Sequence, residues 1–208
     1  MRISLLTAVA FGATAMLAQP ASAQDDASAQ DKSTTFRGIR VEGDVGGDRF
    51  RSQGVHNDKL GYGGTIGFDG VIADRIVIGP EASYWRASDW TENCTPAVAG
   101  GDICHKSFEE WGAAVRLGYL VTPRFLVFGK GGYVTNEQRK RFDAPAGQTG
   151  FYDHVHSNGY QYGGGLEYTL TDTNGKLPVY VGAQYVYSQY NDHTSRQRLM
   201  GTVGIRFR

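Results

Sequence analysis

From Phe36 onward, apolar side chains alternate with polar side chains or glycine in segments of roughly ten residues. The clearest segment is 160–170, where tyrosines and leucines at even-numbered positions oppose Gln161, Gly163, Gly165, Glu167 and Thr169. A period of two is typical of a β-strand whose two faces meet different surroundings. The same pattern predicts strands at 36–45, 60–68, 76–85, 111–119, 125–135, 160–170, 179–188 and 198–207.

Eight similar strands predict an all-β fold, an eight-stranded antiparallel up-and-down barrel, because closure removes the exposed edges of a sheet. Pro80 weakens only the strand at 76–85, since proline has no donor for a central ladder. The predicted links alternate in length: the longer ones are 48–58, 86–107, 136–158 and 189–196, and the shorter ones are 70–74, 121–124 and 171–177. This alternation is typical of a transmembrane β-barrel, which has short periplasmic turns and longer external loops.

The period alone leaves open which face of the barrel is buried, because a soluble lipocalin-like barrel has the inverse arrangement. The large apolar side chains would overfill the interior of eight strands, whereas glycine, threonine and a few charges fit that space. We therefore expect the apolar face to meet lipid and the polar face to line the lumen. Aromatic residues near the strand ends predict a girdle at the two membrane interfaces. Its members are Tyr84, Trp85, Trp111, Tyr119, Tyr160, Tyr168, Tyr185, Tyr187 and Phe207.

The N-terminus has the pattern of a secretory signal peptide, with Arg2, an apolar run over 3–17 and the cleavage pattern Ala-Ser-Ala at 21–23. Pro20 and the small residues that follow the run argue against the alternative, an N-terminal anchor helix. We expect residues 1–23 to be removed. Residues 24–35 are polar and aperiodic and predict a flexible periplasmic leader, so that the barrel domain spans 36–208.

Balanced charge limits the classes of partner. The chain has 21 Lys and Arg against 21 Asp and Glu and a pI near 7.0, without the basic excess of a nucleic-acid-binding domain. Its mean hydropathy is -0.37, and no run after the N-terminus reaches the roughly 20 apolar residues of a helical membrane span. A barrel fits these averages, because an apolar outer band is averaged with a polar lumen and wet loops. The glycines at 163–165 are followed by no phosphate-binding Lys-Ser/Thr, and we predict no cofactor.

Several short stretches resemble a known family. They are 38–43 (GIRVEG), 131–133 (GGY), 181–187 (VGAQYVY) and 203–207 (VGIRF). Together with the leader they make residues 36–208 similar to the small outer-membrane β-barrel proteins, which include opacity-type surface proteins and the membrane domain of outer membrane protein A. The resemblance implies the outer membrane of a Gram-negative bacterium, with lipopolysaccharide and the barrel assembly machinery as partners. Members commonly end in an aromatic residue that this machinery reads, whereas here Arg208 follows Phe207.

Two residue types in the long links carry candidate chemistry. Cys94 and Cys104 share the link 86–107, and passage through the oxidising periplasm predicts a disulfide worth about 3 kcal/mol, with free thiols as the alternative. A single C-x9-C pair is a poor zinc motif.

All the histidines fall in predicted long links: His56, His105, His154, His156 and His193. A metal-binding or pH-sensing surface is one interpretation, but strands facing lipid or a packed lumen exclude histidine and leave it to the loops, so we predict no metal site.

Charged residues on the polar strand faces form a further candidate set. They are Arg40, Glu42, Asp44, Glu81, Glu110, Arg116, Lys130, Glu167, Arg198 and Arg206. Buried charges need partners, so opposite signs inside a narrow barrel predict a network that blocks the lumen. A gate or narrow ion path is the alternative interpretation of the same residues.

An enzyme is the alternative of a different class, since some eight-stranded outer-membrane barrels modify lipid A. A deacylase-like site needs a His-x-Ser pair with a nearby acid, and 154–157 (HVHS) has the residue types without the spacing. We therefore predict a non-enzymatic integral outer-membrane barrel with a packed polar lumen. Its loops 48–58, 86–107, 136–158 and 189–196 are expected to serve an extracellular ligand or envelope integrity, and a narrow porin for small solutes is the main alternative.

Overall fold

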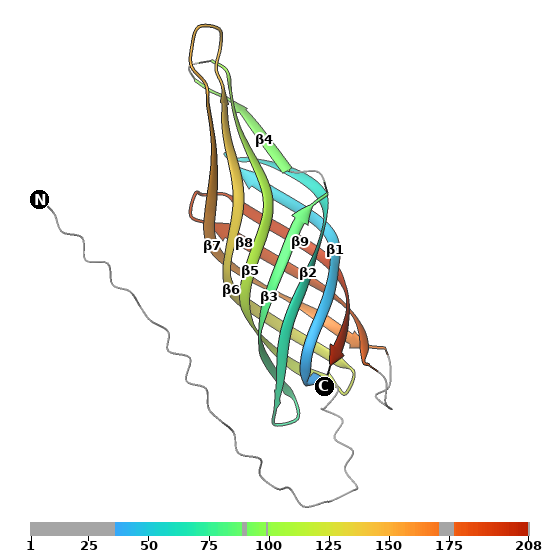
Figure 1. Cartoon of the computed structure of the whole chain (residues 1–208). Coiled ribbons are helices and arrows are strands. Elements are labelled where there is room, and N and C mark those ends of the chain that lie inside the picture. Colours follow the sequence, from blue (N-terminus) through green and yellow to red (C-terminus); the bar gives the residue numbers. More distant parts are fainter. Residues whose placement is uncertain (1–35, 89–90, 99, 171–176, 208) are drawn as a thin grey trace, which may run out of the picture. The chain divides into compact units, whose positions relative to one another are not determined.

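The structure is a computed structural model that describes residues 36–88, 91–98, 100–170 and 177–207 (Figure 1). The predicted signal peptide (1–23), the predicted leader (24–35) and Arg208 lie outside these residues. Within the described part the chain forms nine strands: β1 (Gly38–Ser52), β2 (Val55–Ile72), β3 (Ile76–Ala87), β4 (Thr91–Pro96), β5 (Asp102–Thr122), β6 (Phe125–Asp143), β7 (Phe151–Thr169), β8 (Val179–Tyr190) and β9 (Ser195–Phe207). In these ranges no helix is both long enough and apolar enough to cross a bilayer.

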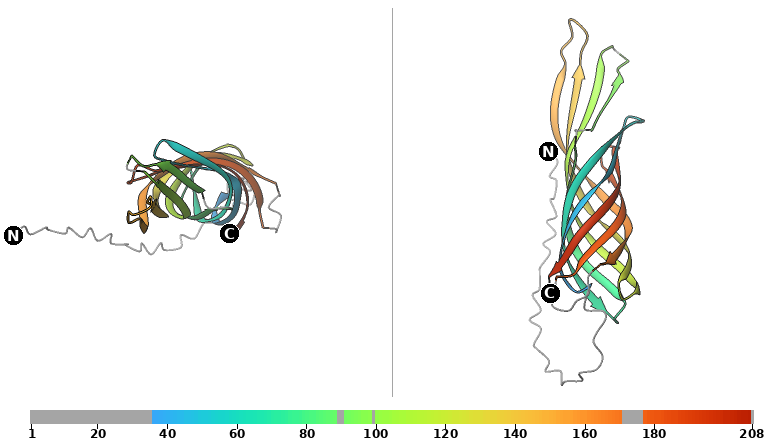
Figure 2. Two further views of the ribbon diagram at one scale, coloured as in Figure 1. Left: turned by 90° about the horizontal axis from the view of Figure 1, so that it is seen from above. Right: turned by 90° about the vertical axis from the view of Figure 1, so that its right-hand side faces the viewer.

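Eight of the strands close into an antiparallel barrel. Apart from β3 and β4, strands that are consecutive in the chain pair with each other, β1 also pairs with β9, and β3 pairs directly with β5 to complete the ring. β4 pairs with the outer part of β5 and takes no part in the ring. Seen from above, the strands enclose a narrow lumen (Figure 2, left). The predicted eight-stranded antiparallel barrel is confirmed.

The two faces of the barrel wall separate apolar from charged side chains. In β1, Ile39, Val41 and Val45 are exposed on the outside, whereas Arg40 and Asp44 are buried in the lumen. The alternation arises because successive side chains of a strand point to opposite faces. Large apolar side chains on the outside and charges on the inside are typical of a barrel whose surface meets lipid, and the reverse of a soluble barrel.

The first predicted loop is a continuous hairpin. β1 and β2 stay in register up to Ser52 and Val55, and only Gln53 and Gly54 lie between them. Both turn residues have positive φ, 51° and 81°, as a two-residue β-hairpin turn requires. The prediction of a loop at 48–58 is therefore wrong.

The other long links are also shorter than predicted. β6 and β7 remain paired as far as Phe142 and Phe151, so the predicted loop 136–158 is largely a hairpin that projects beyond the barrel (Figure 2, right). The link 86–107 contains β4, and in 189–196 the main chain turns back at once, with Tyr190 N donating to the carbonyl of Thr194 at 3.0 Å. Outside a bilayer a strand needs no apolar face toward lipid. The hydrogen-bonded pairing of these strands therefore continues beyond the residues that show the apolar period.

Pro80 lies inside β3, as the sequence predicted, and interrupts one of its two ladders. The β2–β3 register runs from Gly67 opposite Glu81 to Gly70 opposite Ile78, without ladder partners between these pairs. On its other side Pro80 keeps its register position in the β3–β5 pair. A central strand therefore accommodates proline at the cost of a local gap on one side.

Apolar side chains also enter the lumen, which the predicted wholly polar interior did not include. They form three clusters, one of Phe36, Val77, Leu120 and Leu126, one of Trp85, Val186 and Met200, and one of Phe50, Val134 and Tyr190. Phe36 precedes β1 and Phe50 lies near its far end, and both are buried. The buried charges at 40–48 lie between them, so apolar groups fill the lumen on either side of the charged region.

Gly132 tests how closely the barrel strands approach each other. A Cβ atom there would lie 2.1 Å from the carbonyl oxygen of Ala113 and 2.5 Å from Cα of Ala114, both main-chain atoms. At the neighbouring Gly131 a Cβ would meet no atom closer than 3.8 Å. We expect Gly132→Ala to destabilise the barrel by about 1–3 kcal/mol and Gly131→Ala to leave it unchanged. The readout is the folded, heat-modifiable band on unheated gels after refolding in detergent, and equal yields of the two variants would contradict this packing.

Candidate functional site

Buried charges fill the lumen in two groups. The lower cluster, nearer the β2–β3 turn, combines four cations with four carboxylates: Arg40, Arg116, Lys130, Arg206, Glu42, Asp69, Glu81 and Glu167. The upper cluster combines two cations with two carboxylates: Arg196, Arg198, Asp48 and Glu110. Each cluster therefore has no net formal charge.

Asp69 of β2 is the centre of the lower cluster. Its Oδ2 lies 2.7 Å from Nη2 of Arg116, 3.3 Å from Nη2 of Arg206 and 3.2 Å from Nε of Arg40. Glu167 of β7 bridges two of the same arginines, at 2.5 Å from Arg206 and 3.0 Å from Arg116. These side chains come from β1, β2, β5, β7 and β9, so the ion pairs join opposite walls of the barrel.

Glu81 of β3 extends the lower cluster to β6. Its two carboxylate oxygens lie 2.8 Å from Arg40 and 2.8 Å from Lys130. Glu42 pairs with Arg40 and accepts a hydrogen bond from the Tyr180 hydroxyl at 2.8 Å. Because every carboxylate has at least one cationic partner at short range, the desolvation cost of burial is offset within the cluster.

The upper cluster has the same character on a smaller scale. Arg198 lies 2.7 Å from Glu110, and Arg196 lies 3.2 Å from Asp48. The indole nitrogen of Trp85 donates to Asp48 at 2.9 Å. The residues come from β1, β3, β5 and β9, so this cluster also spans the lumen.

Asp44 lies between the clusters along β1 and has neutral partners. Its carboxylate accepts hydrogen bonds from the hydroxyls of Thr202 at 2.6 Å and Thr65 at 3.1 Å, and from the Gln184 amide at 3.1 Å. Three donors can satisfy a buried carboxylate without a cation.

The structure places all ten predicted lumen charges inside the barrel and adds three that the sequence analysis missed: Asp48, Asp69 and Arg196. These three lie just past the ends of the predicted strands. Each keeps the parity of the predicted lumen face, for example Asp48 with Asp44 and Arg196 with Arg198. Continuing the period by one residue to Asp69, two to Arg196 and three to Asp48 would have found them.

Eight of the nine residues of the predicted aromatic girdle lie on the outer face of the barrel. Exposed on the outer face are Trp111, Tyr119, Tyr160, Tyr168, Tyr185 and Phe207, while Tyr84 and Tyr187 are half-buried. The assignment of Trp85 is wrong: it is 2% exposed and lies in the lumen. Tyr84 and Trp85 are adjacent in β3, so they must point to opposite faces, and it is Tyr84 whose ring packs against Trp111, at 4.8 Å between centroids.

The parts of β4, β5, β6 and β7 beyond the barrel form a four-stranded extension, which we call the external sheet (residues 91–96, 102–107, 138–143 and 151–155). On one of its faces the register aligns Glu92, Lys106, Arg139 and His154. Arg139 pairs with Glu92 at 2.7 Å, and the ring of His154 stacks on Phe108 at 5.6 Å between centroids. This face therefore presents both charges and aromatic rings to solvent.

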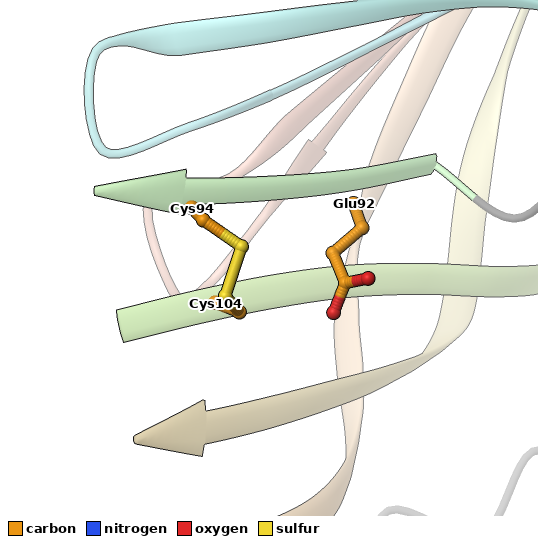
Figure 3. A group of neighbouring side chains, drawn as sticks. All are labelled: Glu92, Cys94 and Cys104. Atoms are coloured by element: carbon orange, nitrogen blue, oxygen red, sulfur yellow. A yellow bond between two sulfur atoms is a disulfide. The ribbon is translucent and has the colours of Figure 1, made fainter. Parts of the chain in front are cut away.

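A disulfide joins β4 to β5 in the external sheet. Cys94 and Cys104 are directly opposite in register, and their sulfur atoms are bonded (Figure 3). The Glu92 carboxylate lies beside them, with its oxygen and the two sulfurs within 4.8 Å of one another. Sulfur in a disulfide is not the thiolate that a metal requires, so this group offers one carboxylate and does not fit a metal site.

The histidines are dispersed over the external part of the molecule. His56, His105, His154 and His156 lie in strands, and His193 lies in the β8–β9 turn. Burial lowers the pKa of the His105 imidazole, and the Lys140 ammonium lowers this pKa further.

Ser157 does not face the neighbouring histidines. It is buried and donates to Asp192 at 2.8 Å, whereas His154 and His156 are exposed on the other face of β7. The residue types of a deacylase site are therefore present in this part of the chain without the hydrogen bond from serine to histidine that would activate the serine.

Comparison with known proteins identifies relatives of this barrel. A family model described as "Outer membrane protein beta-barrel domain" matches residues 9–207. Two structures of Ail, the attachment invasion locus protein of Yersinia pestis, one of them in complex with the heparin analogue sucrose octasulfate, match with TM-scores of 0.50. Their identities are 17% and 16%, over 82% of this chain and 99% of theirs. Neisserial surface protein A matches with a TM-score of 0.49 and 14% identity, over 81% of this chain and 97% of its own. No curated protein matches. At these identities the Ail structures support the fold alone.

Arg116 tests the energetic role of the lower cluster. The Arg116→Met variant leaves Asp69 and Glu167 with fewer partners in a buried site, so we expect it to destabilise the barrel by about 3–5 kcal/mol. Arg49→Gln, which breaks an exposed 2.7 Å pair with Asp58, should cost less than about 1 kcal/mol. Unfolding in urea, followed by the heat-modifiable band, compares them. A loss for Arg116→Met no larger than for Arg49→Gln would contradict the role of the cluster.

The disulfide should stabilise the external sheet and leave the barrel unaffected. Replacing both cysteines by serine removes a constraint worth about 3 kcal/mol on the short β4–β5 connection, which lies outside the closed ring. We expect faster proteolytic cleavage between residues 91 and 107, mapped by mass spectrometry, with an unchanged heat-modifiable band. Loss of that band in the double variant would show that the barrel itself depends on the bridge.

Proposed function

Because this chain belongs to the outer membrane protein β-barrel domain family, we propose that it is a non-enzymatic integral outer-membrane protein with a closed lumen and an external interaction surface. The observation that carries the proposal is the filling of the lumen by two neutral ion clusters and three apolar clusters. A porin needs a polar path that water can occupy along its whole length. Here the same space is occupied by buried side chains.

A single-gate channel is a less favourable interpretation of the same residues. A gate formed by one ion pair would leave the lumen open above and below that pair. In this barrel Asp69, Glu81 and Glu167 each bridge at least two cations, and the upper cluster closes the lumen a second time. Several separate rearrangements would be needed before ions could pass.

The proposal of no enzymatic activity is supported by the arrangement of the nucleophile candidates. The Ser157 hydroxyl donates a hydrogen bond to Asp192, and the described residues around it supply no imidazole hydrogen bond to its hydroxyl. The serine–histidine pair of a deacylase-like site is therefore not formed in this conformation.

The external sheet is the surface that we propose for contacts beyond the membrane. In place of the loops expected from the sequence it has paired strands, which carry the disulfide and a charged and aromatic face. A rigid surface loses little conformational entropy on binding, which favours recognition of an extracellular partner. Lipopolysaccharide around the barrel and the barrel assembly machinery are the further partners of this proposal.

Conductance distinguishes a packed lumen from a gate. Folded wild-type protein in planar bilayers should give small or no conductance. Arg116→Met should give the same, because the upper cluster and the apolar clusters still close the lumen. Large stable steps in the wild type would overturn the closed lumen in favour of a porin, and such steps only in Arg116→Met would identify the lower cluster as a gate. Arg49→Gln, which changes only the outer surface, is the control for reconstitution.

A further inference from the structure

Two histidines of β7 and one glutamate of β6 meet where the external sheet joins the barrel. Residues two apart in a strand point to the same face, so His154 and His156 share the outer face of the β6–β7 hairpin, which projects beyond the barrel (Figure 2, right). Glu137 lies directly opposite His156 in the register. It also contacts His154, which follows it by 17 positions in the chain. The hairpin therefore brings one carboxylate to two imidazoles.

The contact between Glu137 and His154 has the spacing of two metal ligands. Oε1 of Glu137 lies 3.1 Å from Nδ1 of His154. Two ligand atoms that are each about 2.0–2.1 Å from a tetrahedral zinc ion are roughly 3.3 Å from each other. Opposite residues of antiparallel strands have Cβ atoms about 4.5–5.5 Å apart, a distance that imidazole and carboxylate side chains span. Rotation of the exposed His156 side chain therefore brings its imidazole to the same point.

Tyr152 and Phe108 hold the His154 ring in place. The Tyr152 hydroxyl oxygen lies 2.9 Å from Nε2 of His154, on the side of the ring away from the carboxylate. With a metal on Nδ1, Nε2 carries the proton and donates it in a hydrogen bond to the Tyr152 oxygen. A histidine that binds a metal typically has such a partner, which fixes its tautomer and orientation. The ring of Phe108 stacks on the imidazole at 5.6 Å between centroids, with 25° between the planes.

The cations on this face are engaged by other groups. Arg139 pairs with Glu92 at 2.7 Å, and its guanidinium carbon lies 5.4 Å from the centroid of the Tyr152 ring. Nζ of Lys106 lies 5.7 Å from the centroid of the Phe108 ring. The carboxylate of Glu92 neutralises the nearest guanidinium, so the repulsion of a bound cation is reduced. The side chains of His154 and Glu137 are 42% and 33% exposed, so an ion can reach them from solvent.

We propose that His154, His156 and Glu137 bind a divalent transition-metal ion of the zinc class. Two imidazole nitrogens and one carboxylate oxygen form a ligand set that zinc uses in proteins, and the fourth tetrahedral position stays open to water. Imidazole selects zinc, copper and nickel over magnesium and calcium. No metal site was predicted from the sequence, in which Glu137 is remote from the histidines, and the register of β6 and β7 supplies this third ligand. The site goes beyond the proposed function, because it requires neither a closed lumen nor an extracellular partner.

Zinc binding to the untagged protein, refolded in detergent, tests the site. Such a sample contains neither a histidine tag nor lipopolysaccharide, both of which bind divalent cations. Isothermal titration calorimetry with Zn²⁺ should give one ion per chain, and X-ray absorption should show two imidazoles at about 2.0 Å from the zinc. We expect His154→Gln, His156→Gln and Glu137→Gln each to weaken zinc binding more than tenfold. Tyr152→Phe should weaken it about tenfold, as loss of the partner of a metal-binding histidine does.

His56→Gln is the matched control. It removes an exposed histidine on the same face of β2 as the carboxylate of Asp58, and it should leave zinc affinity unchanged. A loss as large as that of His156→Gln would show that surface histidines hold zinc without a defined site, which would overturn the proposal.

The remaining outcomes separate this site from the proposed function. Unchanged zinc affinity in both His156→Gln and Glu137→Gln would overturn the three-ligand site, and displacement of zinc by an equal concentration of Mg²⁺ would overturn its imidazole ligands. The heat-modifiable band shows that each variant has folded. All the substituted side chains lie outside the lumen, so conductance should stay at the wild-type level. A failed metal site and a failed closed lumen therefore give different results.

Discussion

Neutralisation of charge inside a narrow barrel is the constraint on which this structure depends. Neither lipid nor bulk water can solvate the arginines and carboxylates of the lumen, so each must find its partners among the other side chains of the lumen. Asp69 meets three arginines from three different strands, and this is possible only if the barrel is closed and the register is correct. The ion pairs thereby fix the relative heights of the strands, and they occupy the volume through which a solute would otherwise pass.

The strands within the membrane were predictable from the sequence because a bilayer and a filled lumen impose opposite demands on alternate residues. Ten lumen charges followed from this period. Asp48 and Asp69 were not predicted because they lie beyond the predicted ends of their strands. Trp85 was predicted to face outward because it is aromatic, although its position in the alternation of β3 places it in the lumen. The pairing of Asp69 with Arg116 joins residues 47 positions apart, and no local pattern could have predicted that contact.

Beyond the membrane the same reasoning fails for a physical reason. The external sheet extends beyond the closed barrel and has no lipid-facing side, so the apolar alternation that marks a membrane strand disappears while the hydrogen-bonded ladder continues, as it does to Phe142 and Phe151. Composition at 86–107 and 136–158 consequently resembles that of loops. Gly47 lies at the boundary of the two regions, between the exposed side chains of Leu60 and Leu199, and a Cβ atom there would meet nothing within 4 Å.

The separate neutrality of the two ion clusters has an evolutionary consequence. A substitution that removes a charge from the lower cluster can be compensated only by a second change within that cluster, because Asp44 and its neutral partners lie between the two groups. Pairs such as Glu81 with Lys130, or Glu110 with Arg198, should therefore exchange sign or disappear together as lineages diverge, while the other cluster stays as it is. The barrel can change its interior in independent units, which allows wide sequence divergence at constant fold.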